Sequence, residues 1–560
     1  MTSESRESLR WRTMTNGGVG GTDVVSWLLA ATPIVVLLAL VVLGRTSAWL
    51  NGFVALACAV VVGALAFGAG PVVVAVGAVK GVWTGIWILC VVWAALLVFH
   101  LTRQMGLMHL GDLLSSILPR QVENVLIVAW IFPSLIQGVA GFGTPIAVAA
   151  PLLVTMGIAP LRAVALPLVG YHWAVGFGSM GSSFYMGALT ARLDAAETAA
   201  YATEASVLLG LSALVSGLLV CVVHSGLHGL RQGWRLVVVA GLAMAGVQAL
   251  TVQLEPAIGA VTGASAGLVV VAVWRLVTRR ASVEEPVSVA VGGDGGAAQP
   301  DTSSQSDDDT PLTLRAAGLV LVPYAVLIAV VLAVYVPHAS RSWVKGHLLI
   351  GPHLPATRTS EGVVNDAVGP YTPIALLGHP ATYLLLAAVA ALLIWRLLGA
   401  WPRGRLSTAV QGWWRQSLKS SPAVLLLATV ATVMTDTGLV RTIAEGAADV
   451  TGRGFPLVSP LIGTVGAFTT GSTTSANALF AGLQAEVAGL IDVPASALVA
   501  AGLAGGNIGN IVAPMVVAIG VTGVSIRGQE GQVFRLVVLP AAVLLVVVTF
   551  AAAILAGTAA

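Results

Sequence analysis

The sequence predicts an all-α polytopic membrane protein, and three observations support this fold class. First, 57% of the 560 residues are hydrophobic and only 9% are charged, whereas about a quarter of the residues in a soluble protein are charged. Second, the apolar segments are continuous and about twenty residues long, the length of a spanning helix rather than of an alternating membrane strand. Third, Gly, Ser and Thr interrupt two apolar regions, which is typical of helices that unwind where they line a cavity.

The simple spans follow one another along most of the chain. They are predicted at 24–44, 48–68, 83–102, 203–224, 235–252, 257–277, 316–337, 380–399, 421–437 and 534–557. Two irregular apolar regions, 122–190 and 457–524, contain the breaks. Simple spans and irregular regions together predict roughly 12–14 helical segments at the usual span length.

One polar segment, 279–314, separates the two halves of the chain. It begins with Arg279-Arg280 and contains the run Asp307-Asp308-Asp309, a composition that predicts a disordered linker. Lys and Arg favour the cytoplasmic side of a membrane, which places this linker inside and both termini outside. The predicted organisation is an external segment 1–23, a first repeat region 24–224, connecting spans 225–278, a cytoplasmic linker 279–314 and a second repeat region 315–560 with an external loop 338–378.

The two halves resemble each other after a shift of 328 residues. The shift places Gly143 on Gly471 and Gly178 on Gly506, and several predicted spans also fall on one another. Equivalent loops have opposite sidedness under the orientation above. The sequence therefore predicts two inverted-topology repeats, each with a broken helix or re-entrant hairpin, as in many secondary transporters.

The breaks carry the predicted substrate site. The first, Gln137–Pro145, is rich in glycine, which allows close backbone approach, and a helix restarting at a proline offers free N–H groups to an anion. The second, 466–477, offers hydroxyls and an amide that can orient a carboxylate. Packing of small residues between helices is the alternative reading. The predicted substrate-binding residues are Gly141, Gly143, Thr144, Ser179, Gly471, Ser472, Thr473, Thr474, Ser475, Asn477, Asn507 and Asn510.

Ionisable residues at membrane depth are candidates for proton coupling. His172 lies beside a glycine cluster, and its side-chain type suits proton exchange near neutral pH; a structural histidine is the alternative. Asp436 is the second candidate, and a cap at a helix end is its alternative. Cys58, Cys90 and Cys221 have no paired spacing, so we expect no metal site and no cofactor. The small net charge of +3 gives no reason to expect a nucleic-acid partner.

Four strings resemble the bacterial L-lactate permease family. They are QGVAGFGTPIAVAAPLLVTMGIAPLRAVAL (137–166), VGFGSMG (175–181), TTGSTTSANALFAGLQ (469–484) and GGNIGNIVAP (505–514). The likeness covers nearly the whole chain in span order, and its first string is specific. The resemblance implies a multi-pass proton symporter of the bacterial inner membrane that imports L-lactate, with glycolate and other short 2-hydroxy monocarboxylates as co-substrates. Through the wider ion-transporter superfamily it also implies hairpin tips at 138–145 and 468–477 and an elevator-like movement of a transport domain against a scaffold.

Two other functions stay open at this point. A sodium-coupled carboxylate carrier is the first, because backbone carbonyls at unwound segments can also hold Na⁺. A membrane-embedded enzyme or a channel is the second, although the sequence offers no nucleophile–base pair and no ATP-binding motif. The expected partners are a small anion, protons and the lipid bilayer, and a homodimer is an option that the sequence neither favours nor excludes.

Overall fold

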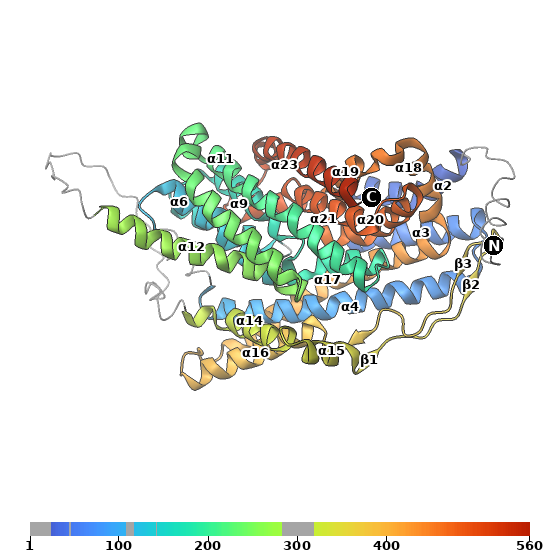
Figure 1. The fold of residues 1–560 in the computed structure, drawn as a ribbon, viewed down its shortest axis with the longest axis horizontal. Helices are drawn as coiled ribbons and strands as arrows, with labels where there is room; N and C mark the ends of the chain where they lie inside the picture. Colours follow the sequence, from blue (N-terminus) through green and yellow to red (C-terminus); the bar gives the residue numbers. More distant parts are fainter. Residues whose placement is uncertain (1–23, 44–45, 108–116, 142, 283–317, 560) are drawn as a thin grey trace.

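The computed structural model describes residues 24–43, 46–107, 117–141, 143–282 and 318–559. These residues are almost entirely helical, which confirms the predicted fold class. Within them, ten helices are long and apolar enough to cross a membrane. The helices run mostly along the long axis of the molecule, with α6 and the end of α12 at one end and strands β2 and β3 at the other (Figure 1).

The first half of the chain contains most of the helices drawn in blue and green. They are α2 (Val24–Leu43), α3 (Ala48–Ala66), α4 (Pro71–Gln104), α6 (Gln121–Leu126), the π-helical segment η1 (Ile127–Ile131), α7 (Phe132–Val139), α8 (Thr144–Thr155), α9 (Pro160–Tyr171), the 3-10 turn η2 (His172–Ala174), α10 (Gly178–Thr190), α11 (Ala195–Val252), the 3-10 turn η3 (Pro256–Ile258) and α12 (Gly259–Ser282).

The second half adds a small β-structured loop to its helices. Its helices are α14 (Val322–Tyr335), α15 (His338–Gly346), α16 (Pro380–Leu397), α17 (Arg405–Asp436), α18 (Leu439–Thr451), the 3-10 turn η4 (Gly452–Gly454), α19 (Phe455–Thr470), α20 (Thr473–Ile491), α21 (Ala495–Ile511), α22 (Pro514–Gly523) and α23 (Glu530–Ala559). The loop holds two antiparallel pairs, β1 (Leu349–Ile350) with β4 (Ile374–Ala375) and β2 (Thr357–Arg358) with β3 (Val364–Asn365).

Local sequence explains where several helices begin. Proline occupies the first position of α4, α9, α16 and α22, where its fixed φ suits a helix and its missing N–H is not needed. The longest helix, α11, begins with a capping box. The Asp194 side chain accepts from the backbone of Glu197 at 2.8 Å, and Glu197 accepts from the backbone of Asp194 at 2.9 Å.

The structure corrects several predicted boundaries. The separate spans at 203–224 and 235–252 belong to α11, which kinks where Ser225 and Gly226 leave helical φ and ψ. The span at 316–337 is shorter, because α14 ends at Tyr335 and the chain bends by 95° into α15. Helices α4 and α17 extend beyond the predicted 83–102 and 421–437. The predicted segment 1–23 and most of the linker 279–314 fall outside the described residues.

Two hydrophobic clusters divide the helices. One lies mainly among α6–α11 and α21–α23. The other lies mainly among α2–α4, α14, α16, α17, α18 and α20, and residues of α7, α10 and α12 also join it. We call the helices α2–α4 and α14–α18 the frame, and α6–α12 with α19–α23 the core body. In Figure 1, α14 and α16 of the frame lie along the lower edge with α4 above them, whereas α18 of the frame lies along the upper edge with α11, α23 and α19 of the core body.

The frame is built around an antiparallel pair, α4 and α17. Three glycines one turn apart on α4 let the backbones approach, because a Cβ at each would collide with α17. The glycines are Gly77, Gly81 and Gly85, and the α17 residues that they face are Val433, Thr429 and Leu425 in that order. Residue numbers rise along α4 while the residue numbers of the facing positions fall along α17. The two helices therefore run in opposite directions.

Candidate functional site between the two helix breaks

The first break is a short extended turn between α7 and α8. Helix α7 ends at Val139, Ala140 is extended, and Gly143 adopts the left-handed conformation with φ 80° before α8 begins at Thr144. A side chain at Gly143 would also collide with Ile519 of α22. Glycine is therefore required here both for the backbone conformation and for close packing.

The second break has the same construction. Gly471 is left-handed with φ 69°, and α20 begins at Thr473. Ser472 is the N-cap, and its Oγ accepts from the backbone N–H of Ser475 at 3.3 Å, which satisfies one of the free donors at the helix start. A Cβ on Gly471 would come within 2.7 Å of the Met515 side chain.

A third irregular segment, at the start of α10, supports the first break. Ser179, Met180 and Gly181 all have left-handed φ, at 47°, 54° and 76°. For the two residues other than glycine this conformation costs about 1–2 kcal/mol each, so surrounding contacts must stabilise it. One such contact is the hydrogen bond that the Gly141 N–H donates to Ser179 Oγ at 2.9 Å.

The two breaks meet around one small cavity. Its volume is about 20 Å³, and its lining residues are Gln137, Gly143, Val175, Ser179, Ser183, Gly471, Ser472, Thr473, Thr474 and Asn510. Ser183 Oγ and Thr474 Oγ1 are 2.9 Å apart, which joins α10 of the first half to α20 of the second. A cavity of this size holds about one water molecule, so the tips must separate to admit a larger ligand.

This cavity suits an anion, although it offers no positively charged side chain to neutralise it. None of its described lining residues is charged, and the N-termini of α8 and α20 both begin at it. Helix N-termini favour anions through their free N–H groups and their dipole. Thr473 Oγ1 and Asn510 Oδ1 are buried without a partner in the structure. Buried polar atoms without partners are rare, and here they offer a hydroxyl and an amide to a ligand.

The structure brings seven of the predicted binding residues to this cavity and places the other five around it. Gly141 adjoins it through Ser179, and Thr144 is buried at the start of α8. Ser475 lines a separate cavity against α2 and α3.

Asn477 Nδ2 donates to the Ser183 carbonyl at 2.8 Å, and Asn507 Nδ2 donates to the Trp173 carbonyl at 3.2 Å. The side-chain amides of Asn477 and Asn507 therefore bind the backbone carbonyls of α10 and of the 3-10 turn η2, and they do not line the tip cavity.

His172 lies in the unwound segment between α9 and α10 and is 1% exposed. Its Nδ1 lies 2.8 Å from the Val169 carbonyl. Because a carbonyl can only accept, Nδ1 carries the proton, and Nε2 is left without a partner in the structure. His172 is thus near the breaks but does not line their cavity.

Asp436 lies elsewhere, in a network of ion pairs at the end of α17. Its two oxygens accept from Lys80 Nζ and from Arg192 Nη2, both at 2.7 Å. Lys80 belongs to the frame, whereas Arg192 follows α10 in the core body. The Arg192–Asp436 pair therefore crosses between the two groups of helices, and Asp436 is separate from the cavity at the tips.

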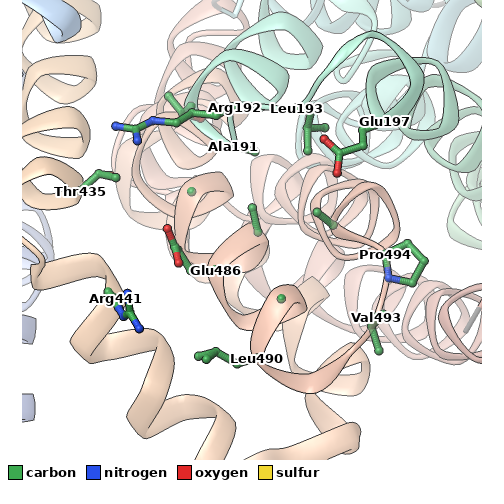
Figure 2. Close-up of a pocket in the computed structure, with 15 residues that line it drawn as sticks. Ala191, Arg192, Leu193, Glu197, Thr435, Arg441, Glu486, Leu490, Val493 and Pro494 are labelled. Atoms are coloured by element: carbon green, nitrogen blue, oxygen red, sulfur yellow. The ribbon is translucent and has the colours of Figure 1, made fainter. Parts of the chain in front are cut away.

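A much larger cavity of about 590 Å³ opens beside Arg192, between the core body and α17 and α18 of the frame. Figure 2 shows Arg192, Glu486 and Arg441 along one side and Glu197 and Pro494 along the other. Charges of both signs line it, in contrast to the uncharged cavity at the tips.

Sequence reasoning missed three lining residues and both ion pairs of Asp436. Gln137, Val175 and Ser183 line the tip cavity. Gln137 opens the first string and Val175 the second, whereas Ser183 lies two positions beyond the second string. A polar side chain close to a break was the available signal for Gln137 and Ser183. The pairing of Lys80 with Asp436 joins helices 356 positions apart, and a single sequence gives no signal for such a contact.

Comparisons with known proteins identify the family of this chain. A family model described as L-lactate permease matches residues 26–558. The chain belongs to the L-lactate permease family. Members of this family are permeases, that is, transporters and not enzymes. With ten candidate spans, the chain is a multi-pass protein of the bacterial inner membrane.

Curated relatives extend over almost the full length. The glycolate permease GlcA of Escherichia coli K12 is 28% identical, with 93% of each chain covered. The L-lactate permease of the same organism is 30% identical over 87% of this chain and 89% of that protein. An L-lactate permease of Bacillus subtilis is 26% identical, with 92% and 93% covered.

Two solved structures were also found. The YdaH transporter of Alcanivorax borkumensis has a TM-score of 0.49 at 15% identity and covers 85% of this chain and 87% of its own. MtrF of Neisseria gonorrhoeae has a TM-score of 0.44 at 15% identity, with 83% and 80% covered.

Proposed function

We propose that this protein imports L-lactate, glycolate and other short 2-hydroxy monocarboxylates by proton symport. One observation carries the proposal: both helix breaks, one from each half of the chain, meet at a single uncharged cavity. Relatives with coverage near 90% are named L-lactate permease and glycolate permease, which gives the substrate class.

The donor set fits a small hydroxy acid. The N–H groups at the starts of α8 and α20 and the hydroxyls of Ser472 and Thr473 can donate to the carboxylate. The side-chain oxygen of Asn510 can accept from the substrate 2-hydroxyl. Because the site is uncharged, it releases its anion more readily than a site with a fixed Arg or Lys would.

We further propose that the core body moves against the frame in an elevator-like manner. The shift of 328 residues carries α4 onto 399–432, which overlaps α17 at 405–436. Inverted repeats relate equivalent helices by an axis in the membrane plane, so equivalent helices run antiparallel. The antiparallel pairing of α4 with α17 supports this symmetry.

Proton coupling distinguishes this proposal from a sodium-coupled carrier. His172 and Asp436 are proton-coupling candidates, and His172 has the more suitable surroundings because its Nε2 is buried without a partner in the structure. Asp436 already accepts from two cations. Replacing His172 with Gln should change the pH dependence of uptake.

The test is uptake of labelled L-lactate into proteoliposomes with an imposed pH gradient or an imposed Na⁺ gradient. We expect accumulation with the pH gradient, inhibition by unlabelled glycolate, and saturable counterflow that separates a carrier from a channel. Accumulation driven only by Na⁺ would contradict proton symport. Failure to exchange either hydroxy acid would contradict the substrate assignment.

A further inference from the structure

Glu255, in the turn between α11 and α12, differs from the other buried carboxylates. Three carboxylates are buried among the residues that the structure describes, namely Glu123, Glu255 and Asp436. Glu123 pairs with Arg120 at 3.1 Å and Asp436 pairs with two cations at 2.7 Å. Glu255 is 3% exposed, and within the described ranges no Lys, Arg or His nitrogen lies at ion-pair distance from it.

The surroundings of Glu255 are aromatic hydroxyls and rings. The Tyr185 hydroxyl of α10 donates to Glu255 Oε1. Tyr335 of α14 and Tyr383 of α16, whose rings are 5.6 Å apart, are its other aromatic neighbours, and the Tyr335 hydroxyl donates to the Gly378 carbonyl at 2.9 Å. These three tyrosines are the titratable groups that face the carboxylate; the nearby His379 ring packs on Trp87 at 4.4 Å.

This cluster lies against the middle of α4, a candidate membrane span. The Trp87 ring is 5.0 Å from the Tyr185 ring, and Trp87 is in the middle of the 34-residue helix α4. An ionised carboxylate at such depth, without a cation, is costly to keep, and ionisable groups there commonly mark proton pathways. A protonated Glu255 is neutral, so the cost disappears.

The cluster also sits where the two bodies meet. Glu255 and Tyr185 belong to the core body, whereas Trp87, Tyr335 and Tyr383 belong to the frame. A movement of the core body against the frame would change the surroundings of the Glu255 carboxylate. A proton carrier needs such a change, because it must bind its proton on one side of the membrane and release it on the other.

Helix α10 connects this cluster to the tip cavity. Tyr185 lies two positions after Ser183, whose Oγ meets Thr474 Oγ1 at 2.9 Å. An anion at the tips and an ionised Glu255 repel each other, so anion binding favours the protonated form of Glu255. By thermodynamic reciprocity, protonation of Glu255 favours anion binding to the same extent.

We propose that Glu255 is a proton-binding site of the transport cycle, with Tyr185 positioning its carboxylate. This inference rests on the proposed proton symport. A proton from the external water joins a Glu255 oxygen as the substrate anion binds, so that loading adds no net charge to the core body. Both leave to the cytoplasmic water after the movement, and the carboxylate is regenerated.

The test compares Glu255→Gln with wild type in proteoliposomes. We measure counterflow of labelled L-lactate at equal pH on both sides, accumulation driven by a pH gradient, and lactate-dependent proton entry with an enclosed pH dye. Glutamine imitates the neutral acid, so counterflow should persist. Gradient-driven accumulation and proton entry should fall to the level of protein-free liposomes.

Glu123→Gln is the matched control, because it removes a buried carboxylate that already has a cation, and it should retain coupling. If wild type shows no proton entry, the proposed symport fails. If wild type is coupled and Glu255→Gln remains coupled, only the role of Glu255 is overturned.

Tyr185→Phe tests the proposal if Glu255→Gln fails to insert, because this variant keeps the carboxylate and removes its hydrogen-bond donor. A changed pH profile of accumulation supports the proposal, and an unchanged profile overturns it.

Discussion

Ser183 Oγ lies 2.9 Å from Thr474 Oγ1, although the two residues are 291 positions apart in the chain. This contact closes the space between the two helix breaks, because Ser183 and Thr474 both line the cavity there. It also links the hairpin tip of the second half to α10, which carries Tyr185 toward Glu255.

The first prediction concerns this pair. Ser183→Ala and Thr474→Ala should each weaken L-lactate binding, and the double variant should lose less than the two single losses added together. Interhelical hydrogen bonds in membranes contribute about 0.6 kcal/mol on average, so the coupling should be of that order. Equilibrium binding of labelled L-lactate to the four purified proteins measures it, and strictly additive losses would refute a shared role.

The second prediction concerns the left-handed glycine of the second tip. Gly471→Ala forces an L-residue into a conformation that costs roughly 1–2 kcal/mol, and its Cβ meets Met515. Uptake should fall sharply while the protein still inserts. Gly246→Ala is the control, because nothing lies within 4 Å of its added Cβ. Equal uptake by the two variants would show that the tip geometry is not needed.

The third prediction concerns Asn510. If its amide accepts from the substrate hydroxyl, Asn510→Ala should raise the KM for L-lactate about tenfold, which corresponds to about 1.4 kcal/mol. Propionate lacks the hydroxyl, so its weaker inhibition of uptake should be unaffected by the same change. A similar loss for both acids would mean that Asn510 supports the fold of the site and does not read the hydroxyl.

The fourth prediction separates the two ion pairs of Asp436. Lys80→Met removes the buried partner within the frame, and breaking such a pair typically costs about 3–5 kcal/mol. Arg192 is 46% exposed, so Arg192→Gln should cost at most about 1 kcal/mol. Thermal unfolding of the two purified variants compares these effects.

Because the Arg192–Asp436 pair joins the core body to the frame, Arg192→Gln should also change the rate of counterflow exchange. Lys80→Met removes a contact inside the frame and tests stability alone. An unchanged exchange rate in Arg192→Gln would indicate that this pair does not restrain the movement.

Composition and span length were sufficient to predict the fold class, and the positions of both breaks were predictable from glycine and hydroxyl residues inside apolar sequence. Gly143 and Gly471 have the left-handed backbone that such residues suggest. The kink in α11 was not predicted, because Ser225-Gly226 also suits a polar loop between two spans.

The long-range contacts were beyond the sequence. Asp436 could be noticed as an acid in an apolar helix, but its pairing with Lys80 depends on how α4 and α17 pack. Glu255 was missed for the same reason: it lies in a short turn between spans, where an exposed glutamate is ordinary. The packing of α10 against this turn, where the Tyr185 hydroxyl donates to Glu255 Oε1, helps to make it a buried carboxylate.

The most direct test of the central claim is a density map of the purified protein with L-lactate bound. The account predicts density for one lactate between the two tips, in contact with the Gly143–Thr144 and Ser472–Thr473 backbones and with Asn510, and a cavity enlarged from its present 20 Å³. Lactate bound instead in the charged cavity beside Arg192, with the tips still closed, would contradict it.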